Sequence, residues 1–300
     1  MRPDSRAVLM RRLLAIALVA LLLVPLVSAD LDGPDVSREA TGGHAILMEQ
    51  FTATWCEVCA TVDPWMPDFT ADHSNRVVRV ALHPNDHDPF GSPLTNDRLA
   101  LKVLEDNQPL PTFWFDGEDP IVGGVTYSQL AKKLKSAEAR RGHWVGMQMD
   151  WDTWLDGEGT RHQLRLTVED PISENATITI FRLETLTMTS QIANNGIDTH
   201  HGVATQMIVL DRDGQIVKVQ NGTLGWDEVQ SQAESFEFST RGEVDTFVAV
   251  IEDSGVVLGV LGISNMDSAE DSDLMPILTI LLLLSALVCS SVILRRGSSD

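Results

Sequence analysis

Residues 54–59 read Thr-Trp-Cys-Glu-Val-Cys, and this stretch decides the fold that we expect for the chain. Its two cysteines, Cys56 and Cys59, lie three positions apart, and the one other cysteine, Cys289, lies in an apolar segment near the C-terminus. Two thiols at this spacing can close and reopen a small disulfide ring, which suits thiol–disulfide exchange. In that reaction Cys56 attacks and Cys59 resolves the mixed disulfide. The redox group would be the Cys56–Cys59 disulfide itself, so we expect no other cofactor.

The segments around the cysteine pair predict alternating strands and helices. Strands are expected at residues 45–51, 77–82 and 110–115, and helices from about Cys56, at 94–105 and at 128–140. A Trp-Cys-x-x-Cys motif after a buried strand, followed about fifty residues later by Pro111-Thr112, resembles the thioredoxin superfamily. The resemblance covers residues 44–142, roughly a third of the chain.

This resemblance implies an α/β thioredoxin-like domain and a thiol–disulfide oxidoreductase that acts on protein thiols and disulfides. It makes Cys56 the nucleophile and Cys59 the resolving thiol. Pro111 matches the cis-proline that faces the cysteine pair in this superfamily, and Leu110 would pair through its backbone with an extended substrate segment. Trp55 matches the tryptophan that shields the disulfide. Whether the enzyme oxidises, reduces or isomerises its partners is left open.

Three residues near the motif depart from the family pattern or bear on its reactivity. Thioredoxins carry a buried acid at the position of Gln50, where it helps the resolving thiol to lose its proton, and an amide cannot do this. Glu49 could replace that acid only if a bulge turned it inward, because side chains alternate between the two faces of a strand. The start of a helix at Cys56 would lower the thiol pKa, whereas the neighbouring Glu57 opposes this.

Other uses of the cysteine pair were weighed. A zinc ribbon needs a second such pair, and haem attachment needs a histidine where the chain has Ala60. Two alternatives stay open: a redox-inactive scaffold for surface binding or assembly, and delivery of a soft metal through the same thiols. The group His83, Asp86, His87 and Asp88 is expected to be a solvated turn rather than a set of metal ligands, so no metal site is predicted.

The second half of the chain has a different pattern. Residues 143–264 hold short stretches in which apolar and polar residues alternate, such as 162–168 and 176–183, separated by Gly, Asp and Asn turns. A period of two with frequent turns is typical of antiparallel strands. We therefore expect an all-β, sandwich-like domain after the thioredoxin-like domain.

The ends of the chain predict export and a membrane anchor. A basic start and an apolar stretch with small residues before Asp30 suggest a signal peptide. An uncharged apolar run followed at once by Arg295-Arg296 suggests a transmembrane helix whose basic end is cytoplasmic. The expected order is a signal peptide at 1–29, a linker at 30–43, an acidic linker at 265–273, a transmembrane helix at Leu274–Leu294 and a cytoplasmic tail at 295–300. The predicted location is the cell membrane, single-pass, with the ectodomain outside.

The charge of the chain limits its partners. Its 43 acidic and 22 basic residues give a formal net charge of −21 at pH 7. Such a surface repels the phosphate backbone of nucleic acids, so we expect no nucleic-acid partner.

Overall fold

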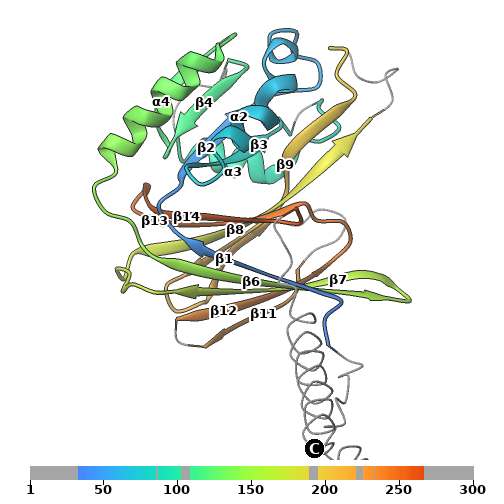
Figure 1. Cartoon of the computed structure of the whole chain (residues 1–300), viewed down its shortest axis with the longest axis vertical. Helices are drawn as coiled ribbons and strands as arrows, with labels where there is room; N and C mark the ends of the chain where they lie inside the picture. Colours follow the sequence, from blue (N-terminus) through green and yellow to red (C-terminus); the bar gives the residue numbers. More distant parts are fainter. Residues whose placement is uncertain are drawn as a thin grey trace, which may run out of the picture. The chain divides into compact units, whose positions relative to one another are not determined.

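The computed structural model describes residues 33–85, 87–102, 109–188, 195–220, 226–232 and 234–266. Two β-sheets dominate these residues (Figure 1). The smaller sheet has five strands in the order β1-β6-β7-β12-β11. Their bounds are β1 Val36–Gly42, β6 Met147–Asp156, β7 Gly159–Val168, β12 Ser235–Arg241 and β11 Trp226–Gln232.

The larger sheet has nine strands in the order β14-β13-β8-β9-β3-β2-β4-β5, with β10 paired to β9 beside this path. Their bounds are β14 Val256–Ser264, β13 Thr246–Asp253, β8 Ala176–Thr187, β9 Thr199–Asp211, β3 Val77–Leu82, β2 Ile46–Phe51, β4 Thr112–Phe115, β5 Glu118–Val122 and β10 Ile216–Gln220. The parallel pairing of Ala81 on β3 with Val203 on β9 joins its two parts.

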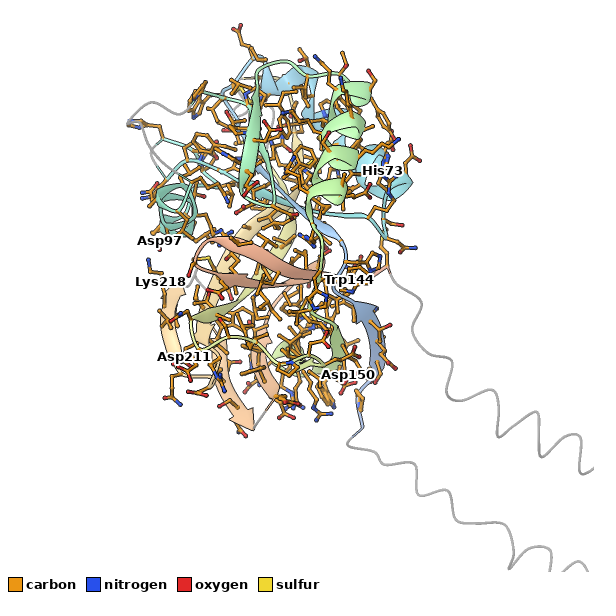
Figure 2. The ribbon with its side chains drawn as sticks, turned by 90° about the vertical axis from the view of Figure 1, so that its left-hand side faces the viewer. His73, Asp97, Trp144, Asp150, Asp211 and Lys218 are labelled. Carbon is orange, nitrogen blue, oxygen red and sulfur yellow. A yellow bond between two sulfur atoms is a disulfide. The ribbon has the colours of Figure 1, made fainter. Side chains whose placement is uncertain are left out.

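Helices cover the part of the larger sheet that contains β2, β3 and β4. They are η1 Cys59–Thr61, η2 Asp63–Trp65, α2 Met66–Asp72, α3 Pro93–Ala100 and α4 Tyr127–Arg140. The first turn of α4 is closed by a capping box, in which Thr126 and Gln129 satisfy each other's backbone amides. Figure 2 shows Asp97 on α3 beside Lys218 on β10, and an ion pair of 2.8 Å joins them.

Hydrophobic cores lie between these layers. Trp151 and Phe247 belong to the core between the two sheets. Val80 and Phe181 belong to a second core, which joins β2, β3 and β4 to strands β8, β9, β13 and β14. Phe69 belongs to a third core, in which α2 and α4 pack on the other face of β2 and β4. Burial on both faces explains why all six residues of β2 are buried.

The expected fold class, an α/β thioredoxin-like domain followed by a separate β-sandwich and a transmembrane helix, is wrong. More of the chain forms strand than helix, and β3 from the first expected domain pairs with β9 from the second within one sheet. The physical reason is that strands of the second half are buried on both faces and pack with the first half. Residues 178–183 of β8 and 247–252 of β13 are all buried, and such strands need a packed layer on each face.

The expected membrane location also finds no support. Over the part of the chain that the structure describes, no helix is both long and apolar enough to cross a bilayer. The expected span at Leu274–Leu294 and the expected signal peptide at 1–29 lie outside the described residues. We therefore do not retain the single-pass location. Residues 36–42, expected within a linker, form strand β1, which pairs with β6.

Candidate functional site

The cysteine pair lies in the turn that follows β2. Cys56 and Cys59 form a disulfide with a Cα–Cα distance of 5.2 Å. Their surroundings differ, because Cys56 keeps 7% of its surface exposed and Cys59 is fully buried. The backbone amide of Cys59 donates a hydrogen bond to Cys56 Sγ at 3.0 Å. Cys56 is therefore the less deeply buried of the two cysteines, and Cys59 is closed off from solvent.

The expected helix at Cys56 is absent. Two short 3-10 segments, η1 and η2, follow the turn, and the α-helix α2 begins only at Met66. Pro64 and Pro67 lie in the first positions of η2 and α2, where a missing N–H costs nothing. In the interior of one longer helix either proline would remove a hydrogen bond, so the chain starts new segments instead. The amide of Cys59, not an α-helix terminus, is the donor that faces Cys56 Sγ.

Exposed side chains adjoin Cys56 along the chain. Trp55 is 42% exposed and Val58 is 43% exposed, and Glu57 between the cysteines is also exposed. Leu110 packs against the small cluster that contains both cysteines, and the Leu110–Pro111 peptide bond is cis. The structure thus brings the predicted substrate-binding residues Leu110 and Trp55 to the same small region as the disulfide.

Gln50 points to the face of β2 that carries η2, where it holds a carboxylate that we did not anticipate. Its Nε2 donates to Asp63 Oδ1 at 2.5 Å, and Thr52 Oγ1 donates to Asp63 Oδ2 at 2.7 Å. Arg79 Nε donates to Gln50 Oε1 at 2.7 Å. The buried acid of this site therefore comes from η2, four residues after Cys59, and not from the strand. Residues about one helical turn apart lie on the same side of a helical segment, so this spacing could have identified Asp63 from the sequence.

Glu49 lies on the opposite face of β2 and is fully buried. It pairs with Arg98 at 2.8 Å and with Lys102, and Arg98 also pairs with Glu252 at 2.8 Å. Burial alone would raise the pKa of Glu49, but Arg98 and Lys102 outweigh it and lower the pKa to about 2. No bulge interrupts β2, so Glu49 does not replace the acid expected near the cysteines. It ties β2 to α3 and β13 instead.

The turn after β3 was expected to be solvated, but two of its four singled-out side chains are buried. His83 is 1% exposed and Asp88 is 7% exposed. Asp88 Oδ2 accepts a hydrogen bond from the Thr54 amide at 2.7 Å. Asp88 Oδ1 accepts from the Phe90 amide at 2.9 Å and lies 3.2 Å from His83 Nδ1. Burial raises the pKa of Asp88, but these partners prevail and the pKa is lowered.

The correction has a physical reason. Asp88 satisfies backbone amides that the turns around it would otherwise leave buried and unpaired. His87 is exposed, and Asp86 lies outside the described residues. In the described ranges, no group of three or more His, Cys, Asp or Glu side chains is arranged to hold a metal ion.

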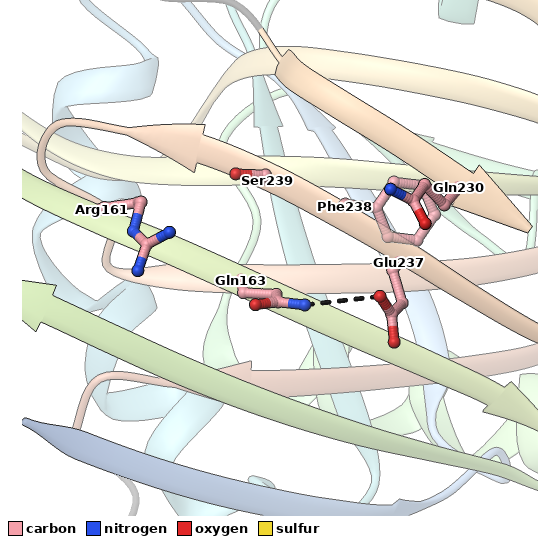
Figure 3. Close-up of a pocket in the computed structure, with 6 residues that line it drawn as sticks. All are labelled: Arg161, Gln163, Gln230, Glu237, Phe238 and Ser239. Atoms are coloured by element: carbon pink, nitrogen blue, oxygen red, sulfur yellow. Dashed lines mark hydrogen bonds between the residues drawn. The ribbon is translucent and has the colours of Figure 1, made fainter. Parts of the chain in front are cut away.

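A small pocket lies elsewhere, on the five-stranded sheet (Figure 3). Gln163 on β7 donates to Glu237 on β12 at 3.4 Å across its floor. The residues that line it are Arg161, Gln163, Gln230, Glu237, Phe238 and Ser239. None of them belongs to the turn that carries the cysteines, so the pocket and the disulfide are separate features.

Comparison with known proteins shows a likeness in fold. No protein-family model matches the chain, and no curated protein matches it. The solved structure of HBP35 of Porphyromonas gingivalis is similar, with a TM-score of 0.52 and 12% sequence identity over 77% of this chain and 78% of that chain. Protein AGR_C_4864 from Agrobacterium tumefaciens gives a TM-score of 0.49 and 11% identity over 75% of this chain and 96% of that chain. At such low identity, the likeness to HBP35 concerns the fold alone.

Proposed function

We propose that this chain is a thiol–disulfide oxidoreductase that acts on protein thiols and disulfides through Cys56 and Cys59. The observation that carries the proposal is the asymmetry of the pair. Cys56 retains 7% of its surface exposed and Cys59 retains none, so Cys56 is the cysteine better placed to meet a partner and Cys59 the one better placed to resolve. The resemblance to the thioredoxin superfamily, which rests on Trp-Cys-x-x-Cys and Pro111, points to the same chemistry.

The reaction needs nothing beyond the two thiols and a partner disulfide. The Cys56 thiolate attacks one sulfur of the partner, a new S–S bond forms, and the other partner sulfur leaves as a thiolate that takes up a proton. The Cys59 thiolate then attacks Cys56 Sγ, which closes the Cys56–Cys59 disulfide and releases the second partner thiol. Two electrons pass from the chain to the partner, and the reverse sequence oxidises a partner dithiol.

Features of the rim support a protein partner over a small thiol. The exposed side chains of Trp55 and Val58 flank Cys56, and Leu110 packs on the same cluster as the two sulfurs. Apolar side chains beside a reactive sulfur gain contact area from a polypeptide segment that lies across them. We therefore assign Leu110, Pro111 and Trp55 to substrate binding, with Cys56 as the nucleophile and Cys59 as the resolving thiol.

A trapping experiment tests this function. The reduced Cys59→Ser variant is mixed with a model peptide disulfide, and intact mass reports any mixed disulfide. We expect the variant to accumulate one covalent peptide on Cys56, because the resolving thiol is gone. The matched control is Cys56→Ser, which should capture little peptide because Cys59 is buried. Equal capture by both variants, or capture by neither, would favour an inert structural disulfide.

The alternative of soft-metal delivery predicts a different result. A carrier would bind Cu(I) stoichiometrically in the reduced wild-type chain and lose it in Cys56→Ser, without forming mixed disulfides. Measuring both properties on the same preparations separates the two functions.

A further inference from the structure

The connection between β8 and β9 reaches the turn that carries the cysteines. Asn195 lies just before β9, and its backbone amide donates to the Thr54 carbonyl at 3.2 Å. Its side-chain Nδ2 donates to the carbonyl oxygens of Ala53 and Cys56, each at 3.3 Å. One residue from the second half of the chain therefore contacts three carbonyls of the segment Ala53–Cys56.

The Asn195 side chain is itself held in place. Its Oδ1 accepts a hydrogen bond from the Ile197 amide at 3.1 Å, which fixes the orientation of the amide group. The two Nδ2 hydrogens then point toward the turn. Such an arrangement is a short side-chain turn of the kind that Asn forms with the backbone two residues on.

The opposite side of the same segment is held by Asp88. Its carboxylate accepts from the Thr54 amide at 2.7 Å and from Thr54 Oγ1 at 3.2 Å. His83 and His200 stack at right angles behind it, with ring centroids 5.3 Å apart, and His200 belongs to β9. Asp88 thus holds the segment through the amide and hydroxyl of Thr54, and Asn195 holds it through the carbonyls of Ala53, Thr54 and Cys56.

We propose that Asn195, just before β9, is a positioning residue for the redox reaction and sets the electrostatic environment of Cys56. The inference rests on the function proposed above and assigns a role to the second half of the chain. Carbonyl oxygens carry partial negative charge, and those of Ala53 and Cys56 adjoin the reactive residue. The Asn195 amide hydrogens offset that charge, so the Cys56 thiolate forms more readily when they are present.

This role makes a graded prediction for two substitutions. Asn195→Ala removes both donors to the carbonyls and leaves the backbone bond to Thr54. Asn195→Asp keeps the size and shape of the side chain but places a carboxylate beside the same carbonyls. We expect the pH midpoint of Cys56 alkylation to rise in the order wild type, Asn195→Ala, Asn195→Asp. A rise of half a pKa unit corresponds to a roughly threefold lower thiolate fraction below the midpoint.

The experiment uses the full reduced chain and measures the rate of iodoacetamide alkylation at Cys56 from pH 5 to 9 by peptide mass. The matched control is Asn265→Ala, because Asn265 also donates through Nδ2 to two oxygens, at 3.2 and 3.3 Å, but these belong to Val244 and Asp245. Each variant keeps the charged and polar neighbours of the turn, Glu57, Asp88, His83 and His200, so their influence on Cys56 is common to all the curves. The thermal midpoint of each variant reports any change in folding.

We expect the pH midpoint of Cys56 alkylation to be higher in both Asn195 variants than in wild type. The midpoint of Asn265→Ala should equal that of wild type. Curves for Asn195→Ala and Asn195→Asp that coincide with wild type would overturn the inference, whatever happens to the thermal midpoint. The equilibrium constant of the disulfide against glutathione gives a second readout that does not need selective alkylation. If this equilibrium constant changes in the Asn195 variants and not in Asn265→Ala, the positioning role is supported even if the trapping experiment fails.

Discussion

One group of buried charges in the described chain is held by pairing opposite charges with one another. Arg98 is the clearest case, since it contacts Glu49 and Glu252 in the interior, where it is 1% exposed. Taking one partner away leaves the others buried and uncompensated, which costs far more than the pair itself contributes. The network therefore fixes where α3 lies on β2 and β13 and does not add a large net stability.

We predict that Arg98→Met lowers the free energy of unfolding by about 3–5 kcal/mol at pH 7, measured by urea titration. The matched control is Arg165→Met, which breaks an exposed ion pair with Glu237 and should cost less than about 1 kcal/mol. Because the pKa of Glu49 is lowered to about 2 from an ordinary 4.5, its ion pairs stabilise the native chain above pH 4.5 and fail as the pH falls toward 2. The difference in the free energy of unfolding between wild type and Arg98→Met should therefore become smaller as the pH falls from 4.5 toward 2. A constant gap would contradict the ionic account.

Local patterns predicted some elements well and others poorly, for reasons that lie in tertiary packing. The strand expected at 45–51 forms as Ile46–Phe51, and the helix expected at 128–140 forms as Tyr127–Arg140 with its capping box. The helix expected at Cys56 does not form, because two prolines interrupt it. Strand β1 carries no apolar run, and its pairing with β6 across more than a hundred residues leaves no trace in local sequence.

The candidate site shows the same division. The motif identified Cys56 and Cys59, and the Pro111 match placed Leu110 beside them. Asp63, Asp88 and Asn195 act through contacts made only in the folded chain, so their neighbours in sequence do not reveal them. Asp88 was assigned to a solvated turn because prolines and charges surround it, yet the carboxylate is buried by its hydrogen bonds to backbone amides.

One glycine controls how β1 continues into β2. Gly43 has φ of +131° and a hypothetical Cβ there would lie 2.0 Å from the Val145 carbonyl oxygen. We predict that Gly43→Ala lowers the free energy of unfolding by at least about 1–3 kcal/mol, from backbone strain and this collision together. Gly142→Ala is the control, because no atom lies within 4 Å of its added Cβ. Equal thermal midpoints for the two variants would show that the backbone at Gly43 can relax.

At the scale of the whole molecule, the two halves of the described chain share one sheet. Strands from residues 46–122 form one side of its order and strands from residues 176–264 form the other, with β3 and β9 as neighbours. The same core packs on Val80 and Phe181. Contacts from Asp35 onward cluster as a single compact unit. The second half is therefore part of the frame that holds the turn with the cysteines, and Asn195 is its direct contact with that turn.

The most direct test of the account is a comparison of the two cysteines within one native molecule. The full chain is mildly reduced at pH 7, exposed briefly to an alkylating reagent, and mapped by peptide mass. We predict rapid labelling at Cys56 and little at Cys59, because 7% of Cys56 and none of Cys59 is exposed. Slow and equal labelling of both thiols would contradict the assignment of an attacking and a resolving cysteine.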